Sequence, residues 1–337
     1  MDFKLTEEQE LIRKNMREFA EKYVDPIAVE IDENSRHPAE LFQKLAEGDW
    51  MGMPIPVEYG GAGADYLTHV IAVEELSRAC ASTGFTVSIH VGIAAMLILL
   101  FGNEQQKQKY LVPLAKGQSL GAFVLTEPGA GTDIMAATTT AVLDGNDYVL
   151  NGTKTFTSNG PTGGIYLVFA WTDKAAGRKG MSAFIIPRNT PGMKAGEHFN
   201  KMGLRSSQTS EMVFKDCRVP KENLLGKEGA GMAMAMTGFD HGRTGIAAQS
   251  VGILQAALDE SIRYSKERVQ FGAPIARQQA ISWMIANMAT DLAAARFLTY
   301  HAAWLKDQGR SNQYETSVAK LAASEVAVHA ANEHYED

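Results

Sequence analysis

Cysteine is scarce in this chain: its 337 residues include only Cys80 and Cys217, far apart and without a Cys-x-x-Cys pair. A disulfide framework needs a larger set of cysteines, and a cysteine zinc site needs closely spaced ones. The sequence therefore predicts neither a disulfide scaffold nor a metal site. Two unpaired cysteines suit a reducing compartment, so we expect a cytoplasmic location.

Positive charge is also in short supply. Lys and Arg number 32 against 39 Asp and Glu, which gives a formal net charge of -7 at pH 7. Nucleic-acid binding requires a basic face that neutralises phosphates. We therefore expect no nucleic-acid partner, although this balance still permits a local basic pocket for a phosphorylated ligand.

Hydrophobic runs are short. The longest apolar stretch, Val91–Phe101, is too short to span a bilayer and predicts a buried helix. The N-terminal residues Met1–Lys4 lead directly into a polar helical pattern, with no signal peptide evident. We therefore expect no membrane insertion.

What the sequence does contain is an ordinary globular mixture, 45% hydrophobic and 21% charged, long enough for two or three domains. Its first third has helical periodicity. Thr6–Gln9 is a capping-box pattern, and apolar residues follow it at helical spacing. Further helices are predicted at Pro38–Glu47, Tyr66–Arg78 and Thr86–Phe101.

The pattern changes to β near Gly121 and stays so to about Pro220. Ala141–Leu143 and Tyr148–Leu150 flank the polar segment Asp144–Asp147, which predicts a hairpin. Short strands at this spacing are typical of a small barrel or sandwich. The further predicted strands are Ile165–Thr172, Ser182–Ile186 and Glu211–Phe214.

Helical composition returns after Asn223. We therefore predict an α+β fold with a helical N-terminal domain over 1–120, a middle β domain over 121–222 and a helical-bundle C-terminal domain over 223–337. The predicted helices of the last part are Gly231–Gly252, Ile253–Arg268, Gln279–Gly309 and Tyr314–Asn332.

Three segments carry candidate chemistry. The first, Phe123–Asp133, runs from a strand into a Gly-rich loop whose backbone could approach a ring or cradle an anion. It is not a Walker loop, because no Lys-Ser/Thr pair follows, and it does not open a Rossmann helix. By itself the segment fits a structural turn equally well.

The second segment, Lys154–Gly160, places Phe156 two residues before Ser158, so both would point to one face of a strand. A core phenylalanine beside a solvated serine is the structural alternative. The third, Arg268–Gly272 followed by Gln279, combines an Arg fork suited to a diphosphate with an aromatic ring. A helix C-terminal arginine with a glycine cap explains the same residues.

Taken together, these segments resemble the acyl-CoA dehydrogenase family. Leu125–Asp133 resembles the family signature in the middle β domain, and Lys154–Gly160 resembles its flavin-contacting strand. Lys201–Thr209 resembles the segment before its last β strands, and Glu267–Gly272 the stretch that reaches a neighbouring subunit's FAD. The resemblance covers essentially the whole chain and its order of helices, strands and helices.

The resemblance implies FAD as the cofactor and gives roles to individual residues. The flavin ring and pyrophosphate would be contacted by Phe123, Leu125, Thr126, Gly131, Thr132, Phe156 and Ser158. The FAD of the adjacent subunit would be served by Arg268, Gln270, Phe271 and Gln279. The acyl-CoA path would be lined by Thr132, Met236, Phe239, Asp240 and Arg243.

The implied reaction is oxidation of the Cα–Cβ bond of an acyl-CoA to the trans-2-enoyl-CoA, as in fatty-acid β-oxidation. A carboxylate would remove the α-proton while the β-hydrogen leaves as hydride to the flavin, and the electrons would pass to an electron-transfer flavoprotein. Val87–Leu97 resembles short-chain members of the family. Because the FAD site would span two subunits, a homo-oligomer is implied, with a homotetramer as a dimer of dimers.

The family pattern breaks at the catalytic base. Most members carry it in a Tyr-Glu-Gly-Thr segment after a Gln-Ile-x-Gly-Gly-x-Gly motif, and neither occurs in this sequence. Glu336 follows a tyrosine but stands about a helix and a half too early, and the position where some relatives carry the base is Gly242. We therefore interpret the C-terminal domain as incomplete and expect impaired activity from these 337 residues.

Other interpretations stay open. The same fold could serve a flavin-dependent monooxygenase or an acyl-CoA oxidase. A non-catalytic remnant could instead bind acyl-CoA or the subunits of an intact paralogue. We interpret His90 as a satisfied core or helix-face residue, not a catalytic one.

Overall fold

The computed structural model describes the backbone of residues 4–336 and the side chains of residues 4–332. The chain divides into two compact units. The first, here called the helical unit, comprises the chain up to Ala28, Asp65–Phe85 and the chain from Arg243 onward. The second, the sheet unit, comprises Val29–Ala64 and Thr86–Gly242. The three predicted domains are a different division and stay a prediction.

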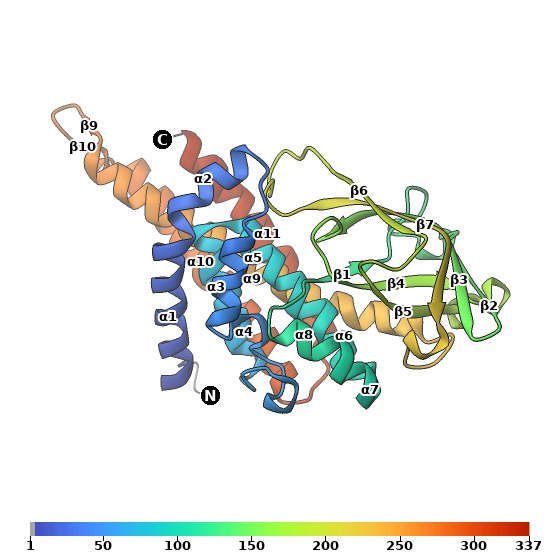
Figure 1. Ribbon diagram of the computed structural model, residues 1–337. Helices are drawn as coiled ribbons and strands as arrows, with labels where there is room; N and C mark the ends of the chain where they lie inside the picture. The colour runs from blue at the N-terminus through green and yellow to red at the C-terminus, as the bar shows by residue number, and fades with distance from the viewer. Residues whose placement is uncertain (1–3, 337) are drawn as a thin grey trace. The chain divides into compact units, whose positions relative to one another are not determined.

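The sheet unit holds, within the described residues, an eight-stranded sheet of order β6-β7-β3-β2-β4-β5-β8, with β1 paired to β4 (Figure 1). The β1–β4 and β2–β4 pairs are parallel, and the other neighbours are antiparallel. The strands are β1 (Gly121–Val124), β2 (Thr140–Asp144), β3 (Asp147–Ser158), β4 (Ile165–Trp171), β5 (Met181–Pro187), β6 (Met193–His198), β7 (Thr209–Pro220) and β8 (Leu224–Leu225).

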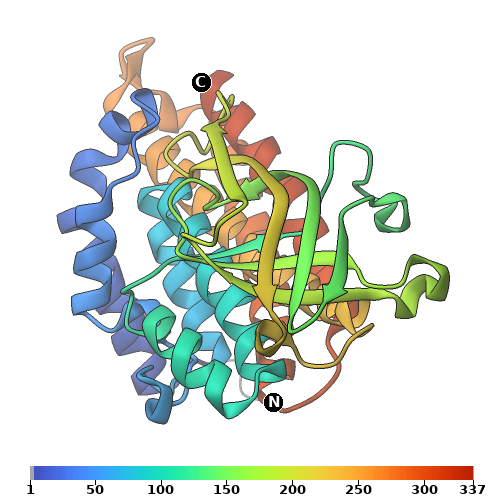
Figure 2. The same ribbon diagram turned by 45° about the vertical axis from the view of Figure 1, so that its right-hand side comes forward.

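The predicted hairpin is confirmed: β2 and β3 pair antiparallel down to Asp144↔Asp147, with Gly145 at φ +63° in the turn. β3 and β7 have 12 residues each and run side by side (Figure 2). The sequence does not predict β6, because Met193–His198 carries no alternating apolar pattern. The α+β class is confirmed, and the strands of the sheet unit form one sheet.

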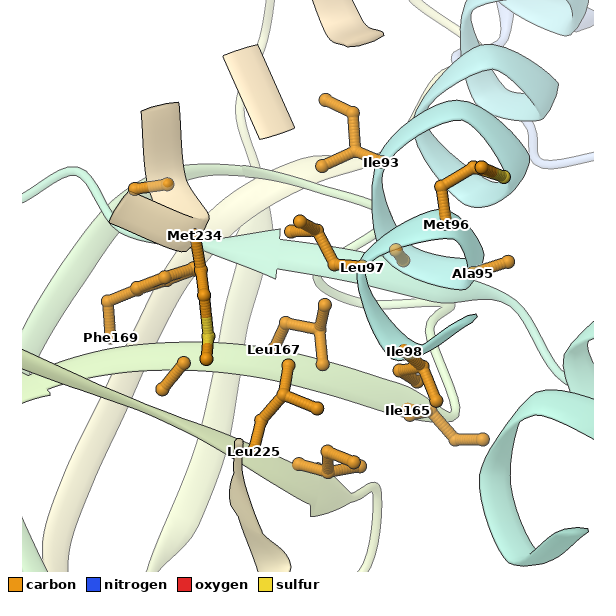
Figure 3. Close-up of a cluster of buried hydrophobic side chains, with 14 of the residues drawn as sticks. Ile93, Ala95, Met96, Leu97, Ile98, Ile165, Leu167, Phe169, Leu225 and Met234 are labelled. Carbon is orange, nitrogen blue, oxygen red and sulfur yellow. The ribbon is translucent and has the colours of Figure 1, made fainter. Parts of the chain in front are cut away.

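Both faces of β4 are buried. On β4, Leu167 and Phe169 belong to one buried cluster, while Tyr166 and Val168 belong to another. The first cluster joins the sheet to a helical run before it. Figure 3 shows Leu97 of that run and Leu167 of β4 pointing into the same space. Burial of these apolar side chains on both faces is the main source of stability for the sheet unit.

Short helices make up the rest of the sheet unit. α2 (Asp25–Glu33) and α5 (Ala81–Val87) each begin in the helical unit and end in the sheet unit. The helices that lie wholly in the sheet unit are α3 (Ala39–Glu47), η1 (Trp50–Gly52), η2 (Val57–Tyr59), η3 (Ser88–Ala95), α6 (Met96–Phe101), α7 (Glu104–Gln106), η4 (Lys107–Leu111) and α8 (Val112–Ala115), and 3-10 turns η5 (Ile134–Ala136), η6 (Lys174–Lys179) and η7 (Lys221–Asn223) join the strands.

The predicted helix at Thr86–Phe101 is confirmed, but it begins earlier, with α5, and its middle part η3 is π-helical. The helical run Ala81–Phe101 is, within the described residues, long and apolar enough to cross a membrane by length and composition. The expectation based on Val91–Phe101 therefore underestimates its length. In the structure, 78% of its most apolar 18-residue window is buried.

His90 lies in η3 and uses both ring nitrogens. Its Nδ1 accepts a hydrogen bond from the N–H of Gly121 at 2.9 Å, and its Nε2 lies 3.2 Å from the carbonyl oxygen of Leu114. The ring thus links η3, β1 and α8, and its interpretation as a satisfied core residue is confirmed. Burial lowers the pKa of His90 to about 4, because the charged ring would lose its hydration.

The helical unit contains α1 (Glu7–Tyr23), α4 (Tyr66–Ala79), most of α9 (Gly231–Glu267), α10 (Gln279–Asp307) and α11 (Gln313–Glu336), with the hairpin β9 (Val269–Gln270)–β10 (Ala273–Pro274) and the turn η8 (Ile275–Arg277) between α9 and α10 (Figure 1). The capping box at the start of α1 is confirmed, because the Thr6 hydroxyl accepts from the N–H of Gln9 and the Gln9 side chain accepts from the N–H of Thr6.

The prediction of two helices that meet at Gly252 is wrong, since α9 is continuous through this residue. Gly252 instead marks a close helix crossing. A Cβ at this position would collide with the carbonyl oxygen of Glu74 on α4. Glycine is used here for its lack of a side chain, and the helix tolerates it because packing against α4 outweighs its low helix propensity.

Carboxylates buried in the helical unit are fully paired. Glu74 accepts from Arg296 Nε at 2.9 Å and from the Tyr300 hydroxyl at 2.7 Å. Glu75 accepts two hydrogen bonds from Arg17, at 2.8 and 2.9 Å. These bonds supply the partners that ionised side chains need when they leave water.

We predict that His90 makes the sheet unit more stable above pH 6.5 than in mild acid. The unfolded ring binds a proton near its usual pKa of 6.5, whereas the folded ring does so only near 4. Stability is therefore complete above 6.5 and falls as the pH drops toward 4, by roughly 3 kcal/mol over that window. Urea unfolding at a series of pH values measures this slope.

His90→Gln should flatten the slope by about one proton and, at neutral pH, cost roughly 1–3 kcal/mol through the lost acceptor for Gly121. The matched control is His198→Gln, which removes a histidine from an exposed position on β6. Equal slopes for the His90 variant and the wild type would contradict the assignment.

Candidate active site

The Gly-rich segment forms a loop between β1 and β2. One carboxylate, that of Glu127, lies where the two ends of this loop meet. Oε2 of Glu127 accepts from the N–H and the hydroxyl of Thr138, at 2.7 and 2.8 Å. Oε1 accepts from the N–H of Thr139 at 3.0 Å. Glu127 therefore joins the beginning of the loop to its end.

Lys154 of β3 lies under the same loop. Its Nζ donates to the carbonyl oxygen of Leu125 at 2.8 Å and to Glu127 Oε1 at 2.9 Å. Both side chains are buried, and that of Lys154 is 0% exposed. The N–H of Thr155 donates to the carbonyl of Thr126 at 2.8 Å. β3 thus holds the residues from which the loop starts.

The electrostatics of this pair follow from burial and proximity. Burial alone would raise the pKa of Glu127, but the Lys154 ammonium and the hydrogen bonds from Thr139 and Thr138 outweigh it and lower the pKa to about 2. Burial lowers the pKa of Lys154, and the Glu127 carboxylate opposes that change. Each of the two buried charges is therefore stabilised by the other.

The middle of the loop is open. A Cβ built on Gly129 or Gly131 would meet no atom within 4 Å, and Thr132 is exposed. A reciprocal pair of backbone hydrogen bonds between Glu127 and Ala130 keeps the turn tight. The backbone is therefore accessible to a large group, as a Gly-rich cofactor loop requires.

Phe156 is strained and exposed. It has φ +53°, in the left-handed region that large side chains rarely adopt, and its side chain is 68% exposed. A bulge shifts the β3–β7 register between Lys154 and Thr157. The bulge interrupts the simple alternation from which the shared face of Phe156 and Ser158 was predicted, although the exposure still alternates through buried Thr157.

The strand end that carries Ser158 is tied to β1. Nδ2 of Asn159 donates to the carbonyl of Gly121 at 3.0 Å, and its backbone N–H donates to the carbonyl of Gln208 at 2.7 Å. The buried Thr157 hydroxyl and the Asn159 side-chain oxygen make no hydrogen bond with any described residue. Two unsatisfied polar atoms therefore flank Ser158, as expected beside the edge of a polar ring system.

Phe123 connects residues predicted to bind the cofactor with residues predicted to bind the substrate. Its ring centroid lies 4.9 Å from that of Phe169 on β4 and 5.8 Å from that of Phe239 on α9. A Cβ on Gly238 would lie 3.4 Å from Phe123 and from Ile93 of η3. The tightest contact of that Cβ would be to Leu97, at 3.2 Å, so position 238 of α9 lies against all three side chains.

The predicted acyl-CoA residues of α9 share one helix face. Met236, Phe239, Asp240 and Arg243 are spaced i, i+3, i+4 and i+7. Met236 and Phe239 pack on the buried cluster of the sheet unit, and Asp240 is half-buried. Arg243 is half-buried and is the first residue of α9 that belongs to the helical unit.

The residues predicted to serve a neighbouring subunit's FAD lie in the helical unit. Phe271, at φ +53°, and Gly272, at φ +76°, form the turn of the β9–β10 hairpin, so Gly272 is not a helix cap. The other half of that alternative is confirmed, because Arg268 directly follows the end of α9 and its N–H donates to the carbonyl of Tyr264. The side chain of Phe271 is 95% exposed. Arg268, Gln270 and Gln279 are exposed as well, so all four are accessible to another chain.

The weak candidate for the catalytic base, Glu336, stays a prediction. The side chain of Glu336 lies outside the described residues. Within residues 4–332, Asp240 is the carboxylate on the predicted substrate face of α9. No cluster of three or more His, Cys, Asp or Glu that could hold a metal occurs among the residues the structure describes.

Sequence reasoning missed Lys154, Glu127 and Asn159 as individual residues. All three lie inside the quoted motifs, and a charged or amide residue within an otherwise β-rich apolar stretch was the available signal. Together with Phe156 and the open loop, they fit a flat aromatic cofactor with a phosphate tail, held by backbone groups and a ring.

We predict that Phe156→Gly and Phe156→Ala separate the strain from the binding role of Phe156. Both remove the ring, so both should lower flavin retention. Glycine also relieves the left-handed backbone, whereas alanine does not, so Phe156→Gly should be more stable than Phe156→Ala by about 1 kcal/mol. Thermal unfolding of the flavin-free variants and flavin titration measure the two effects. Equal stability of the variants would refute the strain, and undiminished flavin retention would refute the binding role.

Three family models match the chain. The model "Acyl-CoA dehydrogenase, N-terminal domain" matches residues 6–118, the middle-domain model matches 122–217, and the C-terminal-domain model matches 229–336. Together they account for nearly all of the sequence, and they follow one another in the order that the family resemblance implied.

Individual proteins agree with the models. The chain is 50% identical over 328 residues to "Acyl-CoA dehydrogenase, short-chain specific" of Clostridium acetobutylicum, covering 97% of this chain and 86% of that protein. It is 49% identical over 329 residues to "Acryloyl-CoA reductase (NADH)" of Anaerotignum propionicum, covering 97% and 83%.

The fold agrees as well. The solved structure of butyryl-CoA dehydrogenase from Megasphaera elsdenii superposes with a TM-score of 0.98 at 43% identity, covering 100% of this chain and 89% of that one. With three domain models and relatives at this level of identity, the assignment is unambiguous: the chain belongs to the acyl-CoA dehydrogenase family, whose members are flavoprotein oxidoreductases.

Proposed function

We propose that this enzyme oxidises the Cα–Cβ bond of a short-chain acyl-CoA to the trans-2-enoyl-CoA and passes the electrons to an electron-transfer flavoprotein. FAD is the cofactor of the family. The observation that carries the proposal is the open Gly129–Gly131 loop, rooted on β3 directly before the strained and exposed Phe156. Relatives named for short-chain and butyryl substrates support the chain length.

In this proposal FAD, when bound, would supply the capacity to accept a hydride. The residues that hold it are Phe123, Leu125, Thr126, Gly131, Thr132, Phe156 and Ser158. The acyl-CoA is bound by Thr132, Met236, Phe239, Asp240 and Arg243. Apolar packing around Phe123 and Phe239 excludes water, which strengthens any hydrogen bond to the thioester oxygen as enolate charge develops.

We also propose a shared cofactor site between subunits. Arg268, Gln270, Phe271 and Gln279 are exposed on the helical unit, and a 95% exposed phenylalanine at a hairpin tip is what contact with a second copy would cover. The smallest competent assembly would then be a homodimer, and the expected one a homotetramer in the cytoplasm.

Three other candidates stay open, and the first has a specific motivation. A relative at 49% identity is named as a reductase, so the enzyme could run in the direction of the saturated acyl-CoA. An acyl-CoA oxidase or monooxygenase of the same fold would differ in letting oxygen reach the reduced flavin. A non-catalytic remnant would retain CoA-ester binding without flavin.

The decisive measurement is the visible spectrum of the purified protein, before and after butyryl-CoA is added without oxygen. We predict bound FAD and ligand-induced bleaching, with slow reoxidation when air is admitted. Rapid reoxidation would favour an oxidase, and reduction of crotonyl-CoA with NADH would favour the reductase. A protein that binds butyryl-CoA but holds no flavin would contradict the proposal.

We propose further that α9 supplies no catalytic base, because Asp240 is assigned to ligand binding and position 242 is glycine. The structure shows what a base at 242 would require. A Cβ there would lie 2.8 Å from Cδ1 of Ile93, so a longer side chain needs Ile93 to move or to be shortened. The same contact places position 242 next to the cluster that contains Phe239.

We therefore predict that Ile93→Ala/Gly242→Glu bleaches its flavin with butyryl-CoA at least tenfold faster than Gly242→Glu alone, since a positioned base contributes about 10²–10⁴-fold. Anaerobic stopped-flow absorbance measures the rate. The matched control is Ile93→Ala/Gly242→Gln, which has the same shape without a base. If the Gln and Glu variants bleach equally fast, position 242 does not reach the substrate.

A further inference from the structure

Lys154 and Glu127 form a buried ion pair that the proposed chemistry does not use. The side chain of Lys154 is fully buried and that of Glu127 is 4% exposed, with 2.9 Å between Nζ and Oε1. Burying such a pair loses hydration that mutual attraction rarely exceeds, and apolar replacements are often neutral or stabilising. A contribution to folding stability is therefore a weak explanation for a lysine and a glutamate at these two positions.

The hydrogen bonds of the pair point to another role. Apart from the bond between the two side chains, every hydrogen-bond partner of the two charged groups among the described residues belongs to the two ends of the Gly-rich loop. Lys154 holds the carbonyl of Leu125, and Glu127 holds the N–H groups of Thr138 and Thr139. The Glu127 carboxylate is bonded to two backbone N–H groups and to the Lys154 ammonium. These charge-assisted hydrogen bonds restrict the positions of the peptide groups at both ends of the loop.

The far end of the loop has a second attachment that does not depend on the pair. The carbonyl of Ala137 accepts from Trp171 Nε1 at 2.8 Å and from Lys174 Nζ at 2.9 Å. Among the described residues the Leu125 carbonyl has no such duplicate and is bonded to Lys154, whereas the next carbonyl, that of Thr126, accepts from the N–H of Thr155. Loss of the pair should therefore free the Leu125–Thr126 peptide, while the loop stays attached through the Thr126 carbonyl and at Ala137.

We propose that Lys154 and Glu127 are positioning residues for the flavin: together they fix the Leu125–Thr126 peptides and the width of the loop that receives the cofactor. This inference rests on the proposed cofactor site. The pair acts through the backbone and does not touch the substrate. It explains why a lysine is tolerated at the centre of a β-rich apolar unit.

The test uses the full chain with Lys154→Met/Glu127→Gln. This double change removes both charges together, so no lone charge is left buried, whereas either single change leaves one and risks unfolding. The matched control is Val219→Ala, which removes buried apolar volume at the far end of β7, opposite Tyr148. Urea unfolding then ranks the two variants for stability.

Three readouts report on position and not on stability. We expect the double variant to unfold at a urea concentration close to that of the wild type, yet to bind FAD at least tenfold more weakly, with a changed visible flavin spectrum. In the flavin-free protein, amides between Leu125 and Thr139 should exchange with solvent at least tenfold faster. Val219→Ala should change the urea midpoint and leave these three readouts alone.

The outcomes are distinguishable. Wild-type FAD affinity, spectrum and loop exchange in the double variant would overturn the inference. So would a loss of FAD matched by Val219→Ala at equal stability, because the pair would then act only on the fold. A wild-type chain that holds no flavin would sink the proposed function, and exchange in the flavin-free loop would still decide whether the pair orders it.

Discussion

A lysine ammonium can be buried inside a β-sheet unit only if nearby groups neutralise its charge and accept its hydrogen bonds. That constraint organises this site. The carboxylate that neutralises Lys154 must itself be satisfied, which it is by two backbone N–H groups and a hydroxyl from one short stretch. Once these bonds exist, the loop has a fixed base and a free, glycine-rich middle. The open shape is thus a consequence of charge satisfaction at its root.

The attachment of the loop to β3 also coincides with the position of the bulge in this strand. Lys154 and Thr155 are committed to the loop, and the register with β7 shifts immediately afterwards, at Phe156. A large residue with positive φ persists only where its surroundings hold it. Here the surroundings are the loop on one side and, through Asn159, the first residue of β1 on the other. Strain and rigidity in this region are therefore two aspects of one arrangement.

Much of the architecture was accessible from sequence patterns. Helical periodicity, the capping box at Thr6 and the turn residues of Asp144–Asp147 act locally, so they survive in the fold. Features set by contacts between distant segments were not accessible. Gly252 looked like a helix break because the nearby carbonyl of Glu74 is invisible in the sequence. Family resemblance supplied the cofactor loop, but only coordinates could show that Lys154 and Glu127 secure it.

The helical run Ala81–Phe101 has a consequence for biosynthesis. Its apolar surface is covered in the sheet unit by side chains as late as Ala235, 134 residues after Phe101 in the chain. At about 5–20 residues per second, a ribosome needs roughly 7–27 s to make them. During that interval the nascent chain displays a segment that satisfies the length and hydropathy of a membrane span. Cellular factors that recognise such segments therefore compete with folding for this chain until the sheet is complete.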